Sequence, residues 1–460
     1  MSDTARKMTL WALAWPIFIE MFLHLLLGTA DTLMVSRISD DAVAVVGIAT
    51  QMFNAANILF AAVAAGAGVL ISQRIGARQG EDARLIGIMT VKASLVIGIA
   101  LSLALYFGAS ELAQLLQLEG GLLPLAEIYI SIVGGGMVLT ALMSTLSTVI
   151  RSTGDTQTPM YVAISMNVVH IALNYALIGG ELGFPEMGLA GAAVSTVASR
   201  LLAVVVLYFV WSRAFERRLE LRDWLSSDRS LMKEVLRLGW PLGLNMSSWF
   251  LSQLMIYTFV AMLGAKELAA RTYMNTLESF CFMLGFSIAL AVQIQIAYLF
   301  GAGRTEEAYR STFRASGIGL VIVGLNALLL YALGEPILSI FTTDSDIVTM
   351  CLSLLMLNLI LQPGKMVNMA FGNSLVAVGD TRFTMIISVL SMGFIATGLS
   401  YVLGIQWGWG LTGIYVAMIA DEYLRGVLVV IRWSGRKMLT RGAVREPELE
   451  RGKAALQVGE

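Results

Sequence analysis

Three ionisable residues lie on one face of the first apolar segment of the chain. Glu20, His24 and Asp31 fall within residues 11–35, a stretch that contains no other charged side chain. In a helix, with about 100° per residue, these three side chains point within about 40° of one another. A carboxylate in a low-dielectric environment holds a proton more tightly than in water, so it can bind and release one. We therefore predict an ion-binding site formed by Asp31 with help from Glu20 and His24.

A second polar face is expected on the apolar segment 159–179. Asn167, His170 and Asn174 fall within about 60° of one another on a helix. Amides in such places either join helices by hydrogen bonds or line a cavity, and a histidine reached by water titrates in a useful range. Both interpretations stay open. Weaker candidates for cavity-lining residues are Gln51, Asn54, Asn245 and Trp249.

The second half of the chain has charges of its own within apolar segments. Arg271, Asn275 and Glu278 share one helix face, and Lys365 lies on a later segment. We expect Asn275, Glu278 and Lys365 to line a cavity. A structural ion pair between Glu278 and either Arg271 or Lys365 is an equal alternative.

The last apolar segment of each half also carries charge. Arg200 in the first half lies near the place that corresponds to Asp421, Glu422 and Arg425 in the second half. These groups could form an ion pair between the halves, or they could reach the surface.

Neither metal binding nor enzymatic catalysis is indicated by the sequence. The chain has two cysteines and two histidines, without the spacing of a metal-ligand cluster. No pairing of a nucleophile with a base stands out. We expect no catalytic residue, no metal and no cofactor, so that any ion bound is H+ or Na+.

The composition requires a membrane protein. Hydrophobic residues make up 57% of the chain and charged residues 14%, with a mean hydropathy of +0.76. Spans must be helices because unpaired backbone groups are too costly in hydrocarbon. About twelve segments are long enough to cross a bilayer. They lie at roughly 11–35, 43–71, 86–108, 124–150, 159–179, 188–212, 240–263, 267–298, 315–334, 348–377, 383–404 and 410–433.

Lysine and arginine are concentrated in alternate loops, the pattern of a protein whose termini are both cytoplasmic. Residues 213–237 form a charged connector between two six-helix bundles, 1–212 and 238–433, and residues 434–460 form a disordered cytoplasmic tail. The net charge of −1 gives no reason to expect a nucleic acid partner. We expect a monomer in the cytoplasmic membrane.

The two bundles are copies of one unit. Gly76-Ala77 recurs as Gly301-Ala302, and Trp15-Pro16 recurs as Trp240-Pro241, both with a shift of 225 residues. Gly188-Leu189 recurs as Gly410-Leu411, with a shift of 222. Duplicated bundles are typical of secondary transporters, which bind their substrate where the repeats meet.

Several motifs resemble the multidrug and toxic compound extrusion (MATE) transporters. They are the run 15–20 with Gly28-Thr29-Ala30-Asp31, the turn 151–155, the stretch 174–179, the stretch 269–273, and Gln362-Pro363-Gly364-Lys365. This resemblance, which covers roughly residues 10–433, implies two six-helix lobes forming a V and export of cationic or amphipathic drugs in exchange for H+ or Na+. The family's aspartate on the first helix falls on Asp31.

The sequence also departs from the family pattern. Positions that are acidic in sodium-linked members fall near Trp249 and Val367. A fifth-helix aspartate of other members falls on Asn174, which leaves Glu20, His24 or His170 to supply a second titrating group. We therefore favour protons over sodium. A lipid or lipid-linked oligosaccharide flippase is the alternative function, and a membrane scaffold or receptor is a further rival.

Overall fold

The computed structural model describes residues 8–115, 122–215, 223, 228–437 and 439. In these residues the chain is helical and divides into two compact units. The first lobe comprises Trp15–Ile71 and Gln79–Gly243, and the second lobe comprises Met8–Ala14, Ser72–Arg78 and the described residues from Leu244 onward. The predicted tail, 434–460, lies mostly outside the described residues, as does part of the predicted connector.

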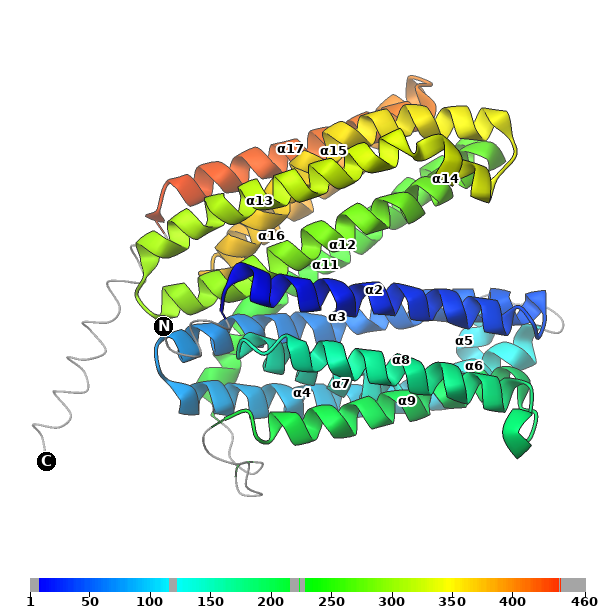
Figure 1. Ribbon diagram of the computed structural model, residues 1–460, viewed down its shortest axis with the longest axis horizontal. Coiled ribbons are helices and arrows are strands. Elements are labelled where there is room, and N and C mark those ends of the chain that lie inside the picture. Colours follow the sequence, from blue (N-terminus) through cyan, green and yellow to red (C-terminus); the bar gives the residue numbers. More distant parts are fainter. Residues whose placement is uncertain (1–7, 116–121, 216–222, 224–227, 438, 440–460) are drawn as a thin grey trace, which may run out of the picture. The chain divides into compact units, whose positions relative to one another are not determined.

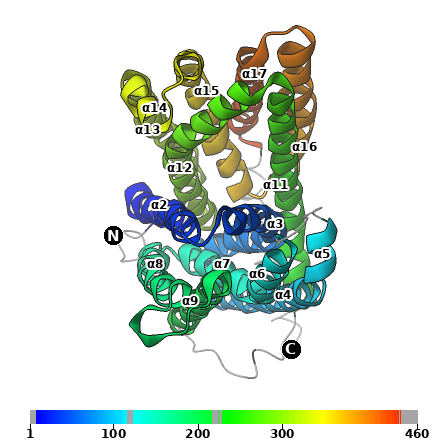
Figure 2. The same ribbon diagram turned by 90° about the vertical axis from the view of Figure 1, so that its right-hand side faces the viewer.

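The first lobe is a bundle of long apolar helices that lie side by side (Figure 1). They are α2 Leu10–Val35, α3 Asp40–Gly76, α4 Gly80–Phe107, α5 Ala109–Leu115, α6 Leu122–Gly135, α7 Met137–Ser152, α8 Gln157–Ile178 and α9 Gly188–Trp211. A short 3-10 turn, Glu181–Gly183, joins α8 to α9. The end-on view shows α4, α6, α7, α8 and α9 as neighbours (Figure 2).

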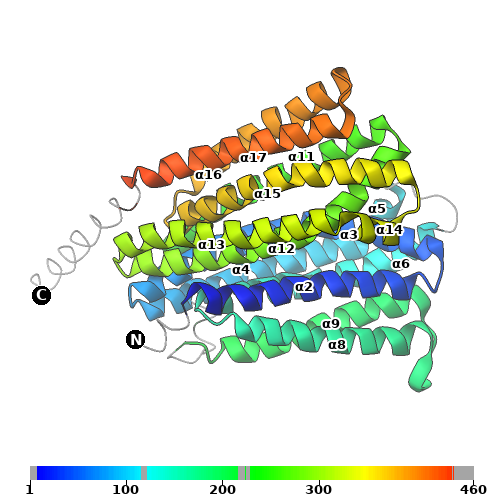
Figure 3. The same cartoon turned by 45° about the horizontal axis from the view of Figure 1, so that its top comes forward.

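The second lobe repeats this order of helices (Figure 3). Its helices are α11 Arg229–Leu263, of which the part up to Gly243 belongs to the first lobe, α12 Ala265–Gly301, α13 Thr305–Ala332, α14 Gly334–Phe341, α15 Ser345–Ala377, α16 Thr381–Ser391 and α17 Gly410–Ser434. Beyond Ser391 the α16 span continues as π-helix over Met392–Leu399 and Tyr401–Gln406. Helix α11 begins at Arg229, within the predicted connector 213–237.

The predicted spans correspond to helices in the structure. Within the described residues, ten helices are long and apolar enough to cross a membrane, and α6 with α7 makes an eleventh span bent by 42°. The bend falls at Gly136, where an added Cβ would lie 2.7 Å from Val197 Cγ2. The predicted twelfth span is α17, which is a continuous helix but carries Asp421, Glu422 and Arg425.

Glycines fix the packing of the last two helices of each lobe. A Cβ on Gly191 of α9 would lie 2.5 Å from the carbonyl oxygen of Leu177 in α8. A Cβ on Gly413 of α17 would lie 2.7 Å from the carbonyl carbon of Leu403. Only glycine permits such close approach of two backbones. Gly191 and Gly413 are related by the same shift of 222 residues as the sequence repeat, so both copies use the same contact.

The turns between helices also follow the repeat. Gly154 and Gly379 have positive φ angles of 95° and 87°, which glycine adopts at low cost. Asp155 accepts a hydrogen bond from the backbone amide of Thr158 in the first turn of α8 at 3.0 Å. Its counterpart Asp380 instead forms an ion pair with Arg432 at 2.8 Å.

Candidate functional site

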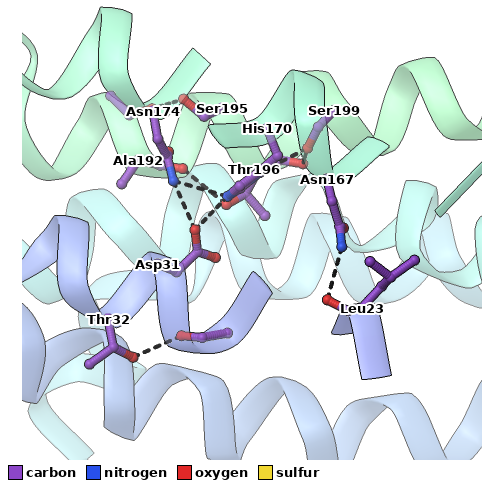
Figure 4. A network of polar contacts seen from close by, with 12 residues as sticks. Leu23, Asp31, Thr32, Asn167, His170, Asn174, Ala192, Ser195, Thr196 and Ser199 are labelled. Carbon is purple, nitrogen blue, oxygen red and sulfur yellow. Dashed lines mark hydrogen bonds and ion pairs between the residues drawn. The ribbon is translucent and has the colours of Figure 1, made fainter. Parts of the chain in front are cut away.

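Asp31 is the centre of a hydrogen-bond network inside the first lobe (Figure 4). Its Oδ1 lies 2.6 Å from Nε2 of His170 and accepts a hydrogen bond from Nδ2 of Asn174 at 2.8 Å. The other ring nitrogen of His170, Nδ1, lies 3.0 Å from Oγ of Ser199. The network therefore joins α2, α8 and α9 through one carboxylate, one imidazole and two neutral polar groups.

The helices present these groups with different access to solvent. His170 and Asn174 lie one turn apart on α8 and are 2% and 1% exposed, while Ser199 on the facing helix is 1% exposed. The side chain of Asp31 is 29% exposed. Close packing of α8 on α9 at Gly191 places Ser199 opposite His170. The histidine is thus enclosed, and the aspartate is the open end of the network.

The hydroxyl of Ser199 can either donate a hydrogen bond to Nδ1 of His170 or accept one from it. This hydroxyl has two acceptors within reach, Nδ1 of His170 at 3.0 Å and the carbonyl oxygen of Thr196 at 3.1 Å. When Ser199 donates to Nδ1, His170 is neutral and donates from Nε2 to the Asp31 carboxylate. When Ser199 turns to Thr196, Nδ1 can carry a proton and donate to Ser199. One added proton is accommodated by one hydroxyl rotation.

A partly buried cation lies near this network. Arg200 of α9 is close enough to Asp31 and Tyr129 to interact with both electrostatically. Its Nη1 donates a hydrogen bond to Thr140 at 2.8 Å. With His170 neutral, Asp31 and Arg200 carry opposite charges that balance. With one more proton, this group carries a net charge of +1.

The other two residues of the predicted first-helix site have a different environment. Glu20 is 6% exposed and forms an ion pair with Arg151 of α7 at 2.9 Å. Eleven residues separate it from Asp31, which is about 16 Å along a helix. His24 is exposed and interacts electrostatically with Glu20, Arg151 and Arg200. Sharing a helix face therefore does not make these residues one site, and it is His170 that touches Asp31.

The remaining candidates in the first lobe are peripheral to the network. Asn167 donates from Nδ2 to the carbonyl oxygen of Leu23 at 2.9 Å, which joins α8 to α2. Within the described residues, the amide oxygens of Asn167 and Asn174 are buried acceptors without a hydrogen-bond donor. Gln51 and Asn54 are exposed on α3.

In the second lobe the structure pairs Glu278 with Arg271. The two lie on α12 with nitrogen and oxygen 3.3 Å apart, and Tyr415 of α17 contacts both. Asn275, from the same predicted face, is exposed. Lys365 and Asn245 are partly buried, and Trp249 is 48% exposed. Of these residues, Glu278 alone belongs to a described buried network.

A second charged group in this lobe lies between α15, the α16 span and α17. Arg425 forms ion pairs with Asp421 and, at 3.0 Å, with Glu422. Asp421 accepts a hydrogen bond from Ser391 at 2.6 Å, and Glu422 accepts one from Asn368 at 2.8 Å. This cluster is satisfied within the second lobe itself. Among the residues that the structure describes, no group of three or more His, Cys, Asp or Glu side chains could hold a metal ion.

Several residues of these networks were not among the sequence candidates. Ser199 and Arg151 complete the contacts of His170 and Glu20, and Tyr415 completes the contacts of Glu278. A serine in an apolar helix is too common to single out. Arg151 has a usable signal, because it is a charge at the end of a span that also needs a partner in hydrocarbon.

A duplicated helical bundle with a titratable network inside one copy defines a multi-pass membrane transporter. The MatE family model matches residues 16–176 and 241–402. The chain is 32% identical over 437 residues to the uncharacterized transporter YisQ of Bacillus subtilis. The aligned region covers 95% of this chain and 96% of that protein. It therefore belongs to the MatE family of multidrug and toxic compound extrusion transporters.

Further comparisons agree with this assignment. The chain is 28% identical over 440 residues to the probable multidrug resistance protein NorM of Thermotoga maritima, with 94% of each protein covered. A MATE structure in the bent conformation matches with a TM-score of 0.86 at 20% identity, covering 96% of this chain and 98% of that chain. A MOP superfamily transporter from Pyrococcus furiosus matches with a TM-score of 0.85 at 19% identity, covering 96% and 97%. At these identities the structures show the fold alone.

Proposed function

We propose that this protein is a proton-coupled antiporter of the cytoplasmic membrane that exports cationic or amphipathic drugs as a monomer. The observation that carries the proposal is the 2.6 Å contact between Asp31 and His170, two titratable groups that share one proton position. The names of relatives such as NorM support drugs as the substrate class. The alternate placement of arginines supports cytoplasmic termini.

The charges near Asp31 explain how proton and drug would exclude one another. With Asp31 ionised and His170 neutral, the carboxylate balances Arg200 and can still attract a cation. A proton taken up by the Asp31–His170 pair gives the group a net positive charge, which repels a cationic drug in a low-dielectric environment. Proton uptake from outside and drug uptake from inside are then alternatives, which is the requirement of antiport.

Hydrogen-bond donors around Asp31 favour a proton over Na+. Both His170 and Asn174 point nitrogen atoms at Oδ1, and a metal ion would have to displace these donors. The unpaired amide oxygen of Asn174 is the feature that favours Na+. Asn167 also has such an oxygen, but it lies seven residues away, about 10 Å along the helix. We therefore place sodium second.

Transport in proteoliposomes tests the proposal. Efflux of a fluorescent cationic dye is measured under an imposed pH gradient and, separately, under a Na+ gradient. We expect the pH gradient alone to drive transport, Asp31→Asn to abolish it, and the exposed-carboxylate control Glu127→Gln to retain it. Transport driven by Na+ alone would overturn proton coupling, and no dye movement under either gradient would overturn drug antiport.

A further inference from the structure

Arg271 of the second lobe is enclosed in a cage of acidic and aromatic side chains. Its Nη1 donates to the hydroxyl of Tyr415 at 2.8 Å and lies 3.3 and 3.4 Å from the two carboxylate oxygens of Glu278. Arg271 is 1% exposed, Glu278 4% and Tyr415 0%. The guanidinium is therefore removed from solvent together with its counter-charge.

Two tyrosine rings complete the cage. The Arg271 guanidinium carbon lies 5.8 Å from the ring centre of Tyr257 on α11 and 5.4 Å from that of Tyr415 on α17. The faces of aromatic rings attract cations within about 6 Å, and cages of this kind recognise organic ammonium groups. A carboxylate beside two tyrosine rings can receive an organic cation, and here the cation over these rings is the guanidinium of the chain itself.

The guanidinium is held less closely than in an ion pair built for stability. Charge-assisted contacts between arginine and carboxylate are typically about 2.7–2.9 Å and often bidentate from two nitrogens. Arg271 instead reaches both oxygens of Glu278 from one nitrogen, at 3.3 and 3.4 Å. Its Nε is buried without an acceptor among the described residues. Tyr415, whose hydroxyl donates to Glu278 at 2.5 Å, holds the carboxylate more closely than the arginine does.

We propose that Tyr257, Glu278 and Tyr415 form a cation-binding site in the second lobe, and that Arg271 occupies it as a tethered guanidinium. In this protein the site is closed to free cations. Without the Arg271 side chain, it accepts a guanidinium ion from solution. This site lies in the second lobe alone and does not depend on which ion Asp31 binds in the first lobe.

Chemical rescue tests this inference. The purified Arg271→Ala variant is melted in detergent with increasing methylguanidinium, a positively charged replacement for the lost group, and with urea as the uncharged control of similar shape. We expect a saturable rise in Tm of about 2–4 °C with methylguanidinium, the size expected for a ligand well above its Kd. Urea should give no saturable rise. Wild type, whose site is filled, and Arg271→Ala/Glu278→Gln, whose site lacks its charge, should not respond.

A failure of Arg271→Ala to fold can also be used to test the proposed cation site. If Arg271→Ala aggregates after solubilisation, the folded fraction is measured by size-exclusion chromatography with methylguanidinium or urea present throughout. Each additive is used at about 20 mM, because a free guanidinium ion is expected to bind weakly. Recovery with methylguanidinium only would support the cation site. Aggregation in both additives, or a thermal response shared by wild type and the double variant, would show that Arg271 and Glu278 are an ordinary structural pair. Dye transport by wild type gives a separate readout for proton coupling.

Discussion

The two lobes are copies of one helical unit, but the acidic residues inside them differ in exposure and in their partners. In the first lobe Asp31 keeps 29% of its side chain exposed and lies 2.6 Å from a histidine. In the second lobe Glu278 is 4% exposed and faces an arginine that stays protonated. Both copies keep the helices and their close contacts, while the side chains around the buried carboxylates differ between them.

One pair of equivalent positions shows this difference directly. Ser199 and Asp421 each lie eleven residues after the glycine that starts the last helix of their lobe, Gly188 or Gly410. In the first lobe this position carries a hydroxyl that adjusts to His170. In the second it carries a carboxylate that is fixed by Arg425 and Ser391.

The largest expected effect is the loss of coupled transport in Asp31→Asn. Asparagine keeps the size of the side chain but cannot be ionised, so we expect pH-driven dye transport to fall at least about 100-fold, the scale of removing a positioned proton-transfer group. Because Asp31 lies at the open end of its network, Tm should change little. A large fall in Tm, with transport per folded molecule retained, would mean that Asp31 is a structural residue. The proposed difference between the two lobes would then be wrong.

Glu278→Gln should have the opposite profile. Removing one partner of a buried ion pair leaves an uncompensated charge, which costs about 3–5 kcal/mol. We expect a marked fall in Tm, while the pH dependence of transport by the surviving folded protein stays like that of wild type. A changed pH dependence with unchanged Tm would move proton coupling into the second lobe.

Serine-to-alanine variants in the two lobes should have smaller effects than the carboxylate variants. Ser199→Ala removes the hydroxyl that allows His170 to change protonation state, so we expect transport to fall several-fold, about 1 kcal/mol in free-energy terms. Ser391→Ala removes a donor to Asp421 and should lower stability by about 1–3 kcal/mol with transport per folded molecule unchanged. Equal effects of the two variants on transport would contradict the prediction that only the first lobe couples transport to protons.

The smallest effects are expected at the turns that follow α3 and α12. Arg78 has φ 59° where its repeat partner Gly303 has φ 71°, so the first copy of the sequence repeat places a side chain in a conformation that favours glycine. We expect Arg78→Gly to be neutral or slightly stabilising, and Gly303→Ala to cost about 1 kcal/mol. Thermal unfolding of both variants checks this, and a stabilising Gly303→Ala would contradict it.

The sequence predicted the helices well because hydrophobic length leaves few alternatives in a membrane. All predicted spans correspond to helices, including α17 despite its charges. The site was only partly predictable. Helix periodicity grouped Glu20 with Asp31, yet the first pairs with Arg151 and the second with His170. Periodicity along one helix says which residues share a face, whereas partners depend on which helix packs against that face.

The chain of hydrogen bonds that begins at Asp31 ends at the carbonyl oxygen of Thr196. A peptide carbonyl accepts a hydrogen bond but has no proton to pass on. The network therefore has one open end. In the proposed antiport cycle, a proton bound at His170 would leave past the exposed side of Asp31, because the Thr196 carbonyl closes the other end of the path. Its destination would then depend on the side of the membrane that Asp31 faces.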